Sequence, residues 1–435
     1  MDLRQPFEIE RLGTCTVTNP ISQSDDIVFM TDEDRLLCDP HLETVAESIE
    51  SGELPSSFEL AGPRHQIFFD PAKTRAAIVT CGGLSPGLNS VIRGIVMQLW
   101  YLYGCKDILG IRYGYGGLGP DALPPLQLTP DLVSNIHHEG GTILGSSRGT
   151  PDTATIVDTL VARGIDVLFT IGGDGTLRGA NAIWQEVRRR GLDIAVVGIP
   201  KTIDNDIPFV RRSFGFETAV SIATQSVRSA EVEAKGAPYG VGLVKLMGRH
   251  AGFIAATAAL AAGNANYVLI PEVPFSLAGP GGLLERLEER LPRKRHAVIV
   301  VAEGAGQECF DDTSLGQDAS GNRALGDIGV LLRDRIKAHF QEHAMPVTLK
   351  YIDPSYLIRS APANATDQIY CDRLARAAVH AGMAGKGGLL IGYWHGRITH
   401  VPMRALEGQT RRVNPQGELW YSVRENTGQP DRMGG

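Results

Sequence analysis

Short apolar runs alternate with longer amphipathic stretches through most of the chain. Apolar runs at 76–80, 167–171 and 194–199 each predict a buried strand, and the stretches 90–103 and 177–190 carry apolar residues at helical spacing. Strands that alternate with helices at this spacing are typical of βαβ units. We therefore expect a parallel sheet whose two faces are covered by helices.

The same alternation returns in the second half of the chain. Strands are expected at 240–246, 267–270, 296–301 and 347–352, helices at 248–262, 283–291, 328–341 and 365–381, and a hairpin over 388–402. Residues 1–70 lack this alternation, and we interpret them as an N-terminal extension of short elements that packs on the body. Partial disorder of this extension is the alternative. The pattern predicts an α/β protein with two similarly built lobes and mainly parallel sheets.

Composition narrows the class of protein. A chain of 435 residues favours two or three domains, and a hydrophobic content of 43% is ample for their cores. The net charge of −7 and the lack of a long basic run argue against a nucleic-acid partner. No stretch approaches the ~20 apolar residues of a membrane span, and the first thirty residues do not resemble a secretory signal. The six cysteines form no CxxC pair and no His/Cys cluster, which indicates free thiols and a cytoplasmic location.

Two polar segments follow two of the expected strands directly. Gly-Gly-Asp-Gly-Thr occupies 172–176, and Lys-Thr-Ile-Asp-Asn-Asp occupies 201–206. Glycines let backbone N–H groups approach a phosphate closely, a carboxylate can hold Mg²⁺, and another can accept a proton from an attacking hydroxyl. These segments predict a phosphoryl-transfer site, although an Asx-turn remains an alternative for the first. A third glycine-rich segment, 82–89, is by itself equally consistent with a tight turn.

Eight segments in order resemble the ATP-dependent 6-phosphofructokinases, in particular the long plant-like type. The matching segments are 81–89, 141–149, 171–176, 199–207, 212–216, 242–252, 302–307 and 350–359. The resemblance covers roughly residues 65–405. It implies the phosphofructokinase fold, with a nucleotide-binding lobe over 71–215 and 362–425, a sugar-phosphate-binding lobe over 216–361 and an extension over 1–70.

The resemblance implies roles for individual residues. ATP is expected at Gly83, Arg148, Gly173, Asp174, Gly175 and Thr176, with Asp174 associated with Mg²⁺. Catalysis is expected to use Asp204 as the base, with Arg148, Lys201, Thr202 and Asp206 beside it. Fructose 6-phosphate is expected at Thr202, Asp204, Met247, Gly248, Arg249, Glu303, Lys350, Tyr356 and Arg359. Negative charge spreads over three oxygens in the transition state, and Arg148, Lys201, Mg²⁺ and backbone N–H groups are its useful partners.

Two positions bear on the phosphoryl donor. Pyrophosphate-dependent relatives carry a second Asp at the position of Gly175, where a carboxylate would repel the α-phosphate of ATP. Gly175 therefore favours ATP, whereas Lys201 also occurs in pyrophosphate users. Gly240 stands where short bacterial members have an arginine that crosses to the neighbouring subunit. Met97 stands where they have a second effector-binding arginine. Interface binding of the sugar and the short members' effector site are therefore in doubt.

The leading interpretation is a glycolytic, allosteric kinase that converts ATP and fructose 6-phosphate to ADP and fructose 1,6-bisphosphate, as a homo-oligomer (dimer or tetramer). A pyrophosphate-dependent enzyme, a kinase of another sugar phosphate and a non-catalytic regulatory subunit are the alternatives. Regulatory subunits lose motif carboxylates and arginines, and this chain keeps them at 148, 174, 204, 206, 249 and 359.

Overall fold

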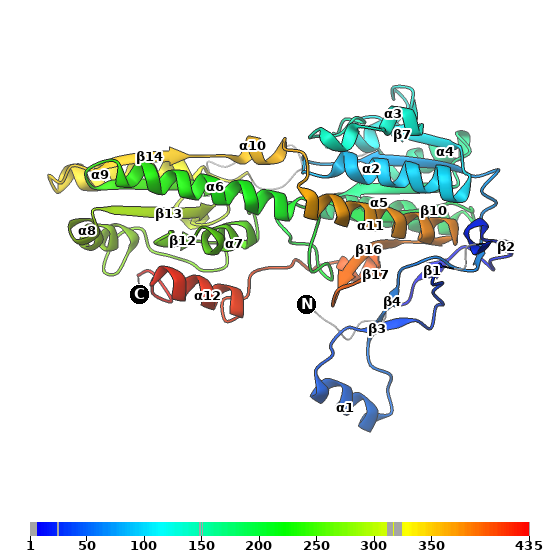
Figure 1. Ribbon diagram of the computed structural model, residues 1–435, viewed down its shortest axis with the longest axis horizontal. Coiled ribbons are helices and arrows are strands. Elements are labelled where there is room, and N and C mark those ends of the chain that lie inside the picture. The colour runs from blue at the N-terminus through cyan, green and yellow to red at the C-terminus, as the bar shows by residue number, and fades with distance from the viewer. Residues whose placement is uncertain are drawn as a thin grey trace. The chain divides into compact units, whose positions relative to one another are not determined.

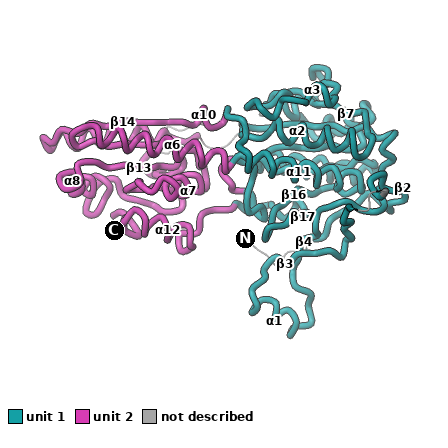
Figure 2. Tube along the Cα trace, in the orientation of Figure 1, with its two compact units in different colours: residues 1–202, 207–215, 360–410 teal, residues 203–206, 216–359, 411–435 magenta. Residues whose placement is uncertain are grey.

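The chain folds into two compact α/β units, each described here by itself (Figure 2). The computed structural model describes residues 7–23, 26–147, 149, 151–310, 316 and 324–434. Unit 1 consists of Met1–Thr202, Ile207–Gly215 and Ser360–Thr410, and unit 2 of Ile203–Asp206, Phe216–Arg359 and Arg411–Gly435. No helix in the described part of the chain is long and apolar enough to cross a membrane.

Unit 1 is built on a nine-stranded sheet in the order β3-β4-β17-β16-β10-β9-β6-β7-β8 (Figure 1). Its strands are β3 Arg35–Leu37, β4 Ser57–Leu60, β6 Arg75–Thr80, β7 Asp107–Ile111, β8 Leu126–Gln127, β9 Val167–Gly172, β10 Ala195–Pro200, β16 Leu389–Trp394 and β17 Arg397–Pro402. The five central strands run parallel, and every residue of β9 and β10 is buried. Their uniform apolar character follows from helices on both faces of the sheet.

Helices cover the two faces of this sheet with separate hydrophobic cores. One face packs against α2 (Leu88–Met97) and α11 (Ala365–Met383), which contact each other. The other packs against α4 (Thr153–Ala162) and α5 (Asp174–Arg189). A short helix, α3 (Pro130–Val133), begins at the cap of Thr129. The alternation of strands and helices that the sequence predicted is therefore confirmed for this unit.

The N-terminal extension widens the sheet of unit 1. Strand β4 pairs antiparallel with β17, and β3 pairs with β4. Shorter pairs join β1 (Glu10–Arg11) to β15 (Lys386–Gly387) and β2 (Val17–Thr18) to β5 (Gln66–Ile67). Helix α1 (Leu42–Ser51) buries none of its residues. Alternation over two to four residues is too short to identify such strands from the sequence.

Unit 2 contains a parallel four-stranded sheet in the order β12-β13-β11-β14. Its strands are β11 Gly240–Leu246, β12 Tyr267–Leu269, β13 His296–Ala302 and β14 Thr348–Ile352. One hydrophobic core includes α6 (Phe216–Lys235), α7 (Phe253–Ala262) and α12 (Glu418–Thr427). The other includes α8 (Leu283–Lys294) and α9 (Ile328–Glu342). The short helix α10 (Ser355–Arg359) precedes the return to unit 1.

The limits of the units differ from the expected lobes at the C-terminus. The first lobe was expected to extend to residue 425, whereas residues from Arg411 onward belong to unit 2. Trp420 and Val423 of α12 explain the difference, because both are buried in the core that contains α7. The expected helix over 248–262 begins only at Phe253, since Gly248 has a φ of 132° that no helix accommodates.

Candidate functional site

The carboxyl ends of β6, β9 and β10 bring three polar or glycine-rich segments together in unit 1. The Cys81 N–H, just after β6, donates to the Ile171 carbonyl of β9 at 2.9 Å. The Lys201 N–H, just after β10, donates to the Gly172 carbonyl at 2.8 Å. The three strands are neighbours and parallel, so the segments that follow them leave the same edge of the sheet. Ligands of open α/β sheets bind at this edge.

Lys201 links two of these segments through its side chain. The residue is buried, with an exposed fraction of 7%, and its Nζ donates to the Gly83 carbonyl at 2.5 Å. A buried ammonium needs such partners because its transfer from water is costly. Lys201 therefore fixes the glycine loop after β6 and adds positive charge to it. The next residue, Thr202, accepts from the Ser213 hydroxyl through its carbonyl at 2.5 Å.

A fourth segment, which contains residues 146 and 147, lies against the same glycine loop. The Gly82 N–H donates to the Ser147 carbonyl at 3.2 Å, and the Ser146 hydroxyl donates to the Gly82 carbonyl at 2.5 Å. The Ser147 hydroxyl donates to the Tyr113 carbonyl at 2.5 Å. These bonds hold 146–147 beside the loop. Arg148, which the sequence assigned to the phosphates, lies outside the described residues, and its role stays a prediction.

Asp174 begins helix α5, with Gly173 as the N-cap. The helix is 16 residues long, and the positive end of its dipole favours an anionic ligand. The Asp174 side chain is half-exposed and pairs with Arg178 at 2.9 Å, one helical turn further on. One accessible carboxylate suits Mg²⁺, which keeps several waters and takes its remaining ligands from phosphates.

The glycines of this loop differ in how much space surrounds them. A Cβ on Gly172 would meet the Thr176 side chain at 2.2 Å, so the approach of Thr176 requires glycine there. A Cβ on Gly83 or Gly175 would meet no atom within 4 Å. Gly175 also has no positive φ, and the backbone therefore tolerates a larger residue. The fold itself therefore does not require glycine at position 175.

The two aspartates of the segment 201–206 belong to unit 2, which contains Ile203–Asp206. Between the two aspartates, Asn205 is buried and has a φ of 57°. Asn tolerates this left-handed conformation better than most residues, which explains the order Asp-Asn-Asp. The Arg411 N–H donates to the Asp206 carbonyl at 2.8 Å, and Arg411 Nη1 donates to the Asn205 carbonyl at 3.0 Å. Arg411 thereby holds the turn.

Asp204 lies beside the ends of β11 and β13. Its Oδ2 accepts from the Arg249 N–H at 3.3 Å. The Glu303 N–H, after β13, donates to the Leu246 carbonyl of β11 at 2.8 Å. A Cβ on Gly304 would lie 1.9 Å from the Arg249 carbonyl, so the two loops meet only because this residue is glycine.

Charge accumulates at this edge of the unit 2 sheet. Burial, together with the neighbouring carboxylates of Asp206 and Glu303, raises the pKa of Asp204 to about 8. The Arg249 N–H and the Arg359 guanidinium partly oppose that rise. Burial also raises the pKa of Glu303, against the attraction of Arg359 first and of Lys245 and Arg249 after it. Carboxyl groups whose pKa values are raised by burial are typical of functional sites.

The remaining sugar-phosphate residues divide into two groups. Arg359 at the end of α10 donates through Nε to the Met247 sulfur at 3.1 Å, which brings it to the same edge as Asp204. Lys350 instead lies mid-way along β14, opposite Gly242, and pairs with Glu233 at 3.6 Å. Tyr356 on α10 has an exposed fraction of 84%. The structure thus groups Asp204, Met247, Arg249, Glu303 and Arg359. Lys350 pairs with Glu233 instead, and Tyr356 precedes Arg359 by three residues on α10.

Two basic residues of unit 2 were missed from the sequence. Lys245 near the end of β11 pairs with Asp327 at 3.0 Å and with Asp353 at 2.9 Å, and its charge acts on Glu303. Arg411 supports the turn at Asn205. Lys245 occupies an ordinary position of an apolar strand, and Arg411 belongs to an Arg-Arg pair far along the chain. Neither pattern indicated a role.

Comparisons with known proteins agree with one another. The family model for phosphofructokinase matches residues 75–382. The chain is 50% identical over 440 residues to an ATP-dependent 6-phosphofructokinase of Amycolatopsis methanolica, covering 98% of this chain and 96% of the relative. It is 46% identical to the ATP-dependent 6-phosphofructokinase of Borreliella burgdorferi, and the match covers 98% of this chain and 97% of that relative. The crystal structure of a pyrophosphate-dependent phosphofructokinase of Marinobacter aquaeolei matches 83% of this chain and 92% of its own, with a TM-score of 0.67. At 23% identity this likeness concerns the fold alone.

Proposed function

The chain belongs to the phosphofructokinase family, and we propose that it transfers the γ-phosphoryl group of ATP to the 1-hydroxyl of fructose 6-phosphate. The products are ADP and fructose 1,6-bisphosphate, as in glycolysis. Relatives named for this activity match almost the full chain, and this supports the assignment. The observation that carries the mechanism is the position of Asp204, a carboxyl with a raised pKa beside the Arg249 backbone and the Arg359 charge.

Asp204 acts as the general base in this proposal. The sugar hydroxyl oxygen forms a bond to the γ-phosphorus while the bond from that phosphorus to the ADP oxygen breaks. The hydroxyl proton passes to the Asp204 carboxylate. A base works best when its pKa lies near the operating pH, and a value of about 8 meets this condition. Asp206 supports that value through its charge.

Unit 1 supplies the groups for the donor. Gly83 and Gly175 leave room for phosphate oxygens near backbone N–H groups, Gly173 is the N-cap of α5, and Thr176 and Thr202 border the same loops. Asp174 is the residue that would hold Mg²⁺, which neutralises phosphate charge when it is bound. Lys201 holds the loop and adds positive charge, and Arg148 is assigned to the transferring phosphoryl group.

Unit 2 supplies the groups for the acceptor. Arg249 and Arg359 carry the positive charge that a sugar phosphate requires, and a guanidinium can grip a phosphate with two parallel bonds. Glu303 is assigned to the sugar hydroxyls, and the Met247-Gly248 turn positions Arg249. Tyr356 and Lys350 are assigned to the sugar phosphate on the strength of the resemblance alone.

Donor and acceptor assays test the proposal. We expect turnover with ATP, fructose 6-phosphate and Mg²⁺, much slower turnover with pyrophosphate, and none without Mg²⁺. The substitution Asp204→Asn should lower kcat by about 10²–10⁴-fold, because it removes the proton acceptor. Glu289→Gln, which changes an exposed carboxylate of α8, is the matched control. Preference for pyrophosphate would refute the donor assignment, and near wild-type turnover of Asp204→Asn would refute the base assignment.

We also propose a homo-oligomer and a cytoplasmic location. The family resemblance supports an oligomer, and scattered free thiols agree with a reducing compartment. Among the relatives, some plant enzymes are named as chloroplastic. Light scattering coupled to size-exclusion chromatography gives the oligomeric state, and cell fractionation gives the location. A monomeric mass, or recovery of the protein outside the cytoplasmic fraction, would contradict these assignments.

A further inference from the structure

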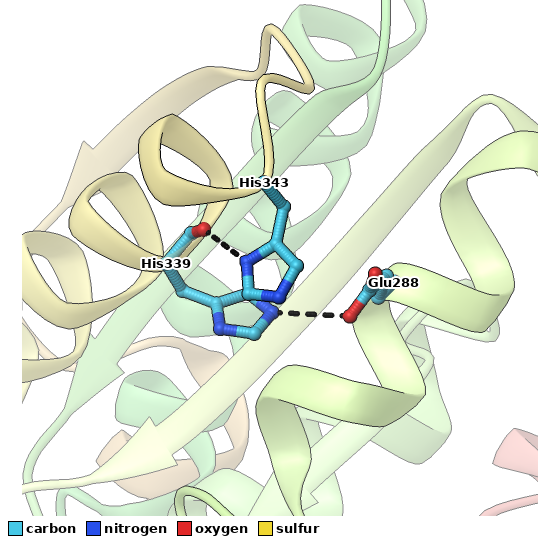
Figure 3. Close-up of side chains that lie close together, drawn as sticks. All are labelled: Glu288, His339 and His343. Carbon is cyan, nitrogen blue, oxygen red and sulfur yellow. Dashed lines mark hydrogen bonds and ion pairs between the residues drawn. The ribbon is translucent and has the colours of Figure 1, made fainter.

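Three possible metal ligands converge in unit 2 on the helices that cover one face of its sheet (Figure 3). Glu288 comes from α8, and His339 and His343 come from α9 and the residue that caps its C-terminus. One ligand atom of each residue lies within 4.8 Å of the others. The two histidines are four residues apart, a spacing that places both side chains on one face of a helix. In the sequence these two residues form a His-x₃-His pair.

Hydrogen bonds prepare the imidazole of His343 for a metal. Its Nδ1 lies 2.8 Å from the His339 carbonyl oxygen. A carbonyl oxygen can only accept, so Nδ1 carries the hydrogen and Nε2 of the neutral ring carries the lone pair. A backbone carbonyl that binds one ring nitrogen and frees the other is a typical outer partner of metal-binding histidines. In Figure 3 the other ring nitrogen of His343 points toward His339 and Glu288.

The second imidazole already faces the carboxylate. His339 Nε2 lies 3.3 Å from Glu288 Oε2. This contact alone is consistent with an ordinary hydrogen bond between neighbouring helices. It does not account for the second ring, which packs against the first with centroids 4.2 Å apart and turns toward the same carboxylate. Two imidazoles brought together without a cation gain little from each other, whereas a metal would bind both.

The helices hold the ligands in reach of each other. Leu287 of α8 and Ile336 and Phe340 of α9 are fully buried in one core, next to the residues that carry the ligands. His343 is exposed, so its ring is free to adjust. Ligand atoms of a tetrahedral zinc site lie about 2.0–2.2 Å from the metal, hence roughly 3.3 Å from each other. His339 Nε2 and Glu288 Oε2 already have that spacing at 3.3 Å, and all three ligand atoms lie within 4.8 Å of one another.

We propose that Glu288, His339 and His343 form a binding site for a divalent transition-metal ion of the Zn²⁺ class. Two imidazole nitrogens and one carboxylate oxygen suit zinc, whereas Mg²⁺ prefers oxygen ligands alone. Water completes the coordination. The ion joins α8 to α9 and stabilises unit 2.

The site is separate from the residues assigned to the reaction. Helix α9 begins after Asp327, whose carboxylate pairs with Lys245 near Glu303. His339 follows Asp327 by 12 residues, so about 18 Å of helix separates it from that pair at 1.5 Å per residue. The proposal therefore does not depend on the proposed function, and the metal is expected to change stability more than turnover.

Isothermal titration calorimetry of the metal-free full-length protein with Zn²⁺ tests the site. We expect one saturable site per chain, and at least a tenfold loss of affinity in each of His339→Ala and His343→Ala. Glu288→Gln should weaken binding by a smaller factor. Zn²⁺ should raise the Tm of the wild type, since it binds the folded state, and should not raise the Tm of the double histidine variant. His41→Ala is the matched control, because His41 is exposed and also pairs with a carboxylate, Asp39.

Co²⁺ distinguishes this site from the half-buried thiols of Cys15 and Cys309. Visible bands of tetrahedral Co²⁺ without a thiolate charge-transfer band support nitrogen and oxygen ligands, and a thiolate band overturns the assignment. The absence of saturable Zn²⁺ binding in the wild type overturns the proposal. Equal affinity in the wild type and in the double histidine variant overturns it as well. Circular dichroism of each variant shows that the fold is retained, so that a loss of affinity reports on the ligands.

Discussion

Replacement of Gly175 by Asp tests the choice of donor directly. A Cβ at this position meets no atom within 4 Å, and the residue has no positive φ. Gly175 is the second residue of α5, where Asp is favoured over glycine by only about 0.3 kcal/mol in helix propensity. An acidic residue in the first turn adds roughly 0.3–1 kcal/mol, reduced by repulsion from Asp174. The substitution should therefore leave the free energy of unfolding unchanged or slightly higher.

The effect on ATP follows from charge. A carboxylate about 6 Å from one phosphate charge costs about 2.8 kcal/mol at an effective dielectric constant of 20. This corresponds to roughly a 100-fold loss in kcat/KM for ATP. Pyrophosphate has no α-phosphate at the position that the carboxylate would occupy, so its kcat/KM should change much less. The uncharged control Gly175→Ala should retain ATP use within a few-fold, because the site has room for a methyl group.

Steady-state kinetics with both donors, and urea unfolding of all three proteins, provide the measurements. If Gly175→Asp used ATP within threefold of the wild type, the electrostatic reasoning would be wrong. If Gly175→Ala lost as much activity as Gly175→Asp, steric exclusion would explain the preference and the charge would not. Unchanged unfolding curves would show that neither result came from loss of the fold.

Three further predictions concern single residues. The kcat/KM for fructose 6-phosphate should fall as the pH drops below about 8, because Asp204 then becomes protonated, and a flat pH–rate profile would contradict the base assignment. Glu59→Gln should lower the free energy of unfolding by about 3–5 kcal/mol, because Glu59 accepts hydrogen bonds from Arg64, Lys386 and His400 in the interior of unit 1. A loss below about 1 kcal/mol in urea unfolding would contradict this prediction. Asn205→Ala should destabilise by about 1–2 kcal/mol through its left-handed conformation, whereas Asn205→Gly should cost less, and the reverse order would show that the Asn side chain matters more than its φ.

Glu59 makes the free energy of unfolding depend on pH at the acid end of the range. Burial opposes the ionisation of Glu59, but the hydrogen bonds and charges of His400 and Lys386 outweigh burial. They lower the pKa of Glu59 well below its usual range. A carboxyl with a depressed pKa stabilises the fold above its unfolded pKa of about 4.3 and loses that contribution as the pH falls. The wild type should therefore lose stability steeply below pH ~4, and Glu59→Gln should lose less over the same interval.

The sequence predicted the strands and helices of the central sheets well, because their apolar runs are long and bounded by glycines. Strand β11 was placed at its observed limits, and β9 and β10 within one residue. The extension was harder, since β3 and β4 gain their stability by pairing with β17, far along the chain. The 20-residue helix α6 was missed, because its many small and polar residues weaken the apolar periodicity.

The candidate site was predicted in part. Motif positions identified Asp204, Arg249, Glu303 and Arg359, which the structure brings to one edge of a sheet. The sequence could not show why Asn205 separates two aspartates, because a backbone φ has no signature beyond the residue type. Neither could it show Arg411, whose partners are about two hundred residues earlier in the chain. Contacts of this range depend on the fold and not on local pattern.

Asp204 ties activity and stability together with opposite signs. Its folded pKa of about 8 lies above the unfolded value of about 3.9, so the folded state binds more protons between these values. Its contribution to stability is fully present below pH ~4 and is lost as the pH rises through 8, the same interval in which the base becomes active. Asp204→Asn removes the charge that burial disfavours while it removes the proton acceptor. That variant should therefore be inactive yet unfold at a higher temperature than the wild type at pH 8, with the difference shrinking toward pH 5. A variant that was inactive and less stable at pH 8 would mean that the amide fits the buried surroundings of Asp204 less well than the carboxyl group does, and that this loss outweighs the relief of buried charge.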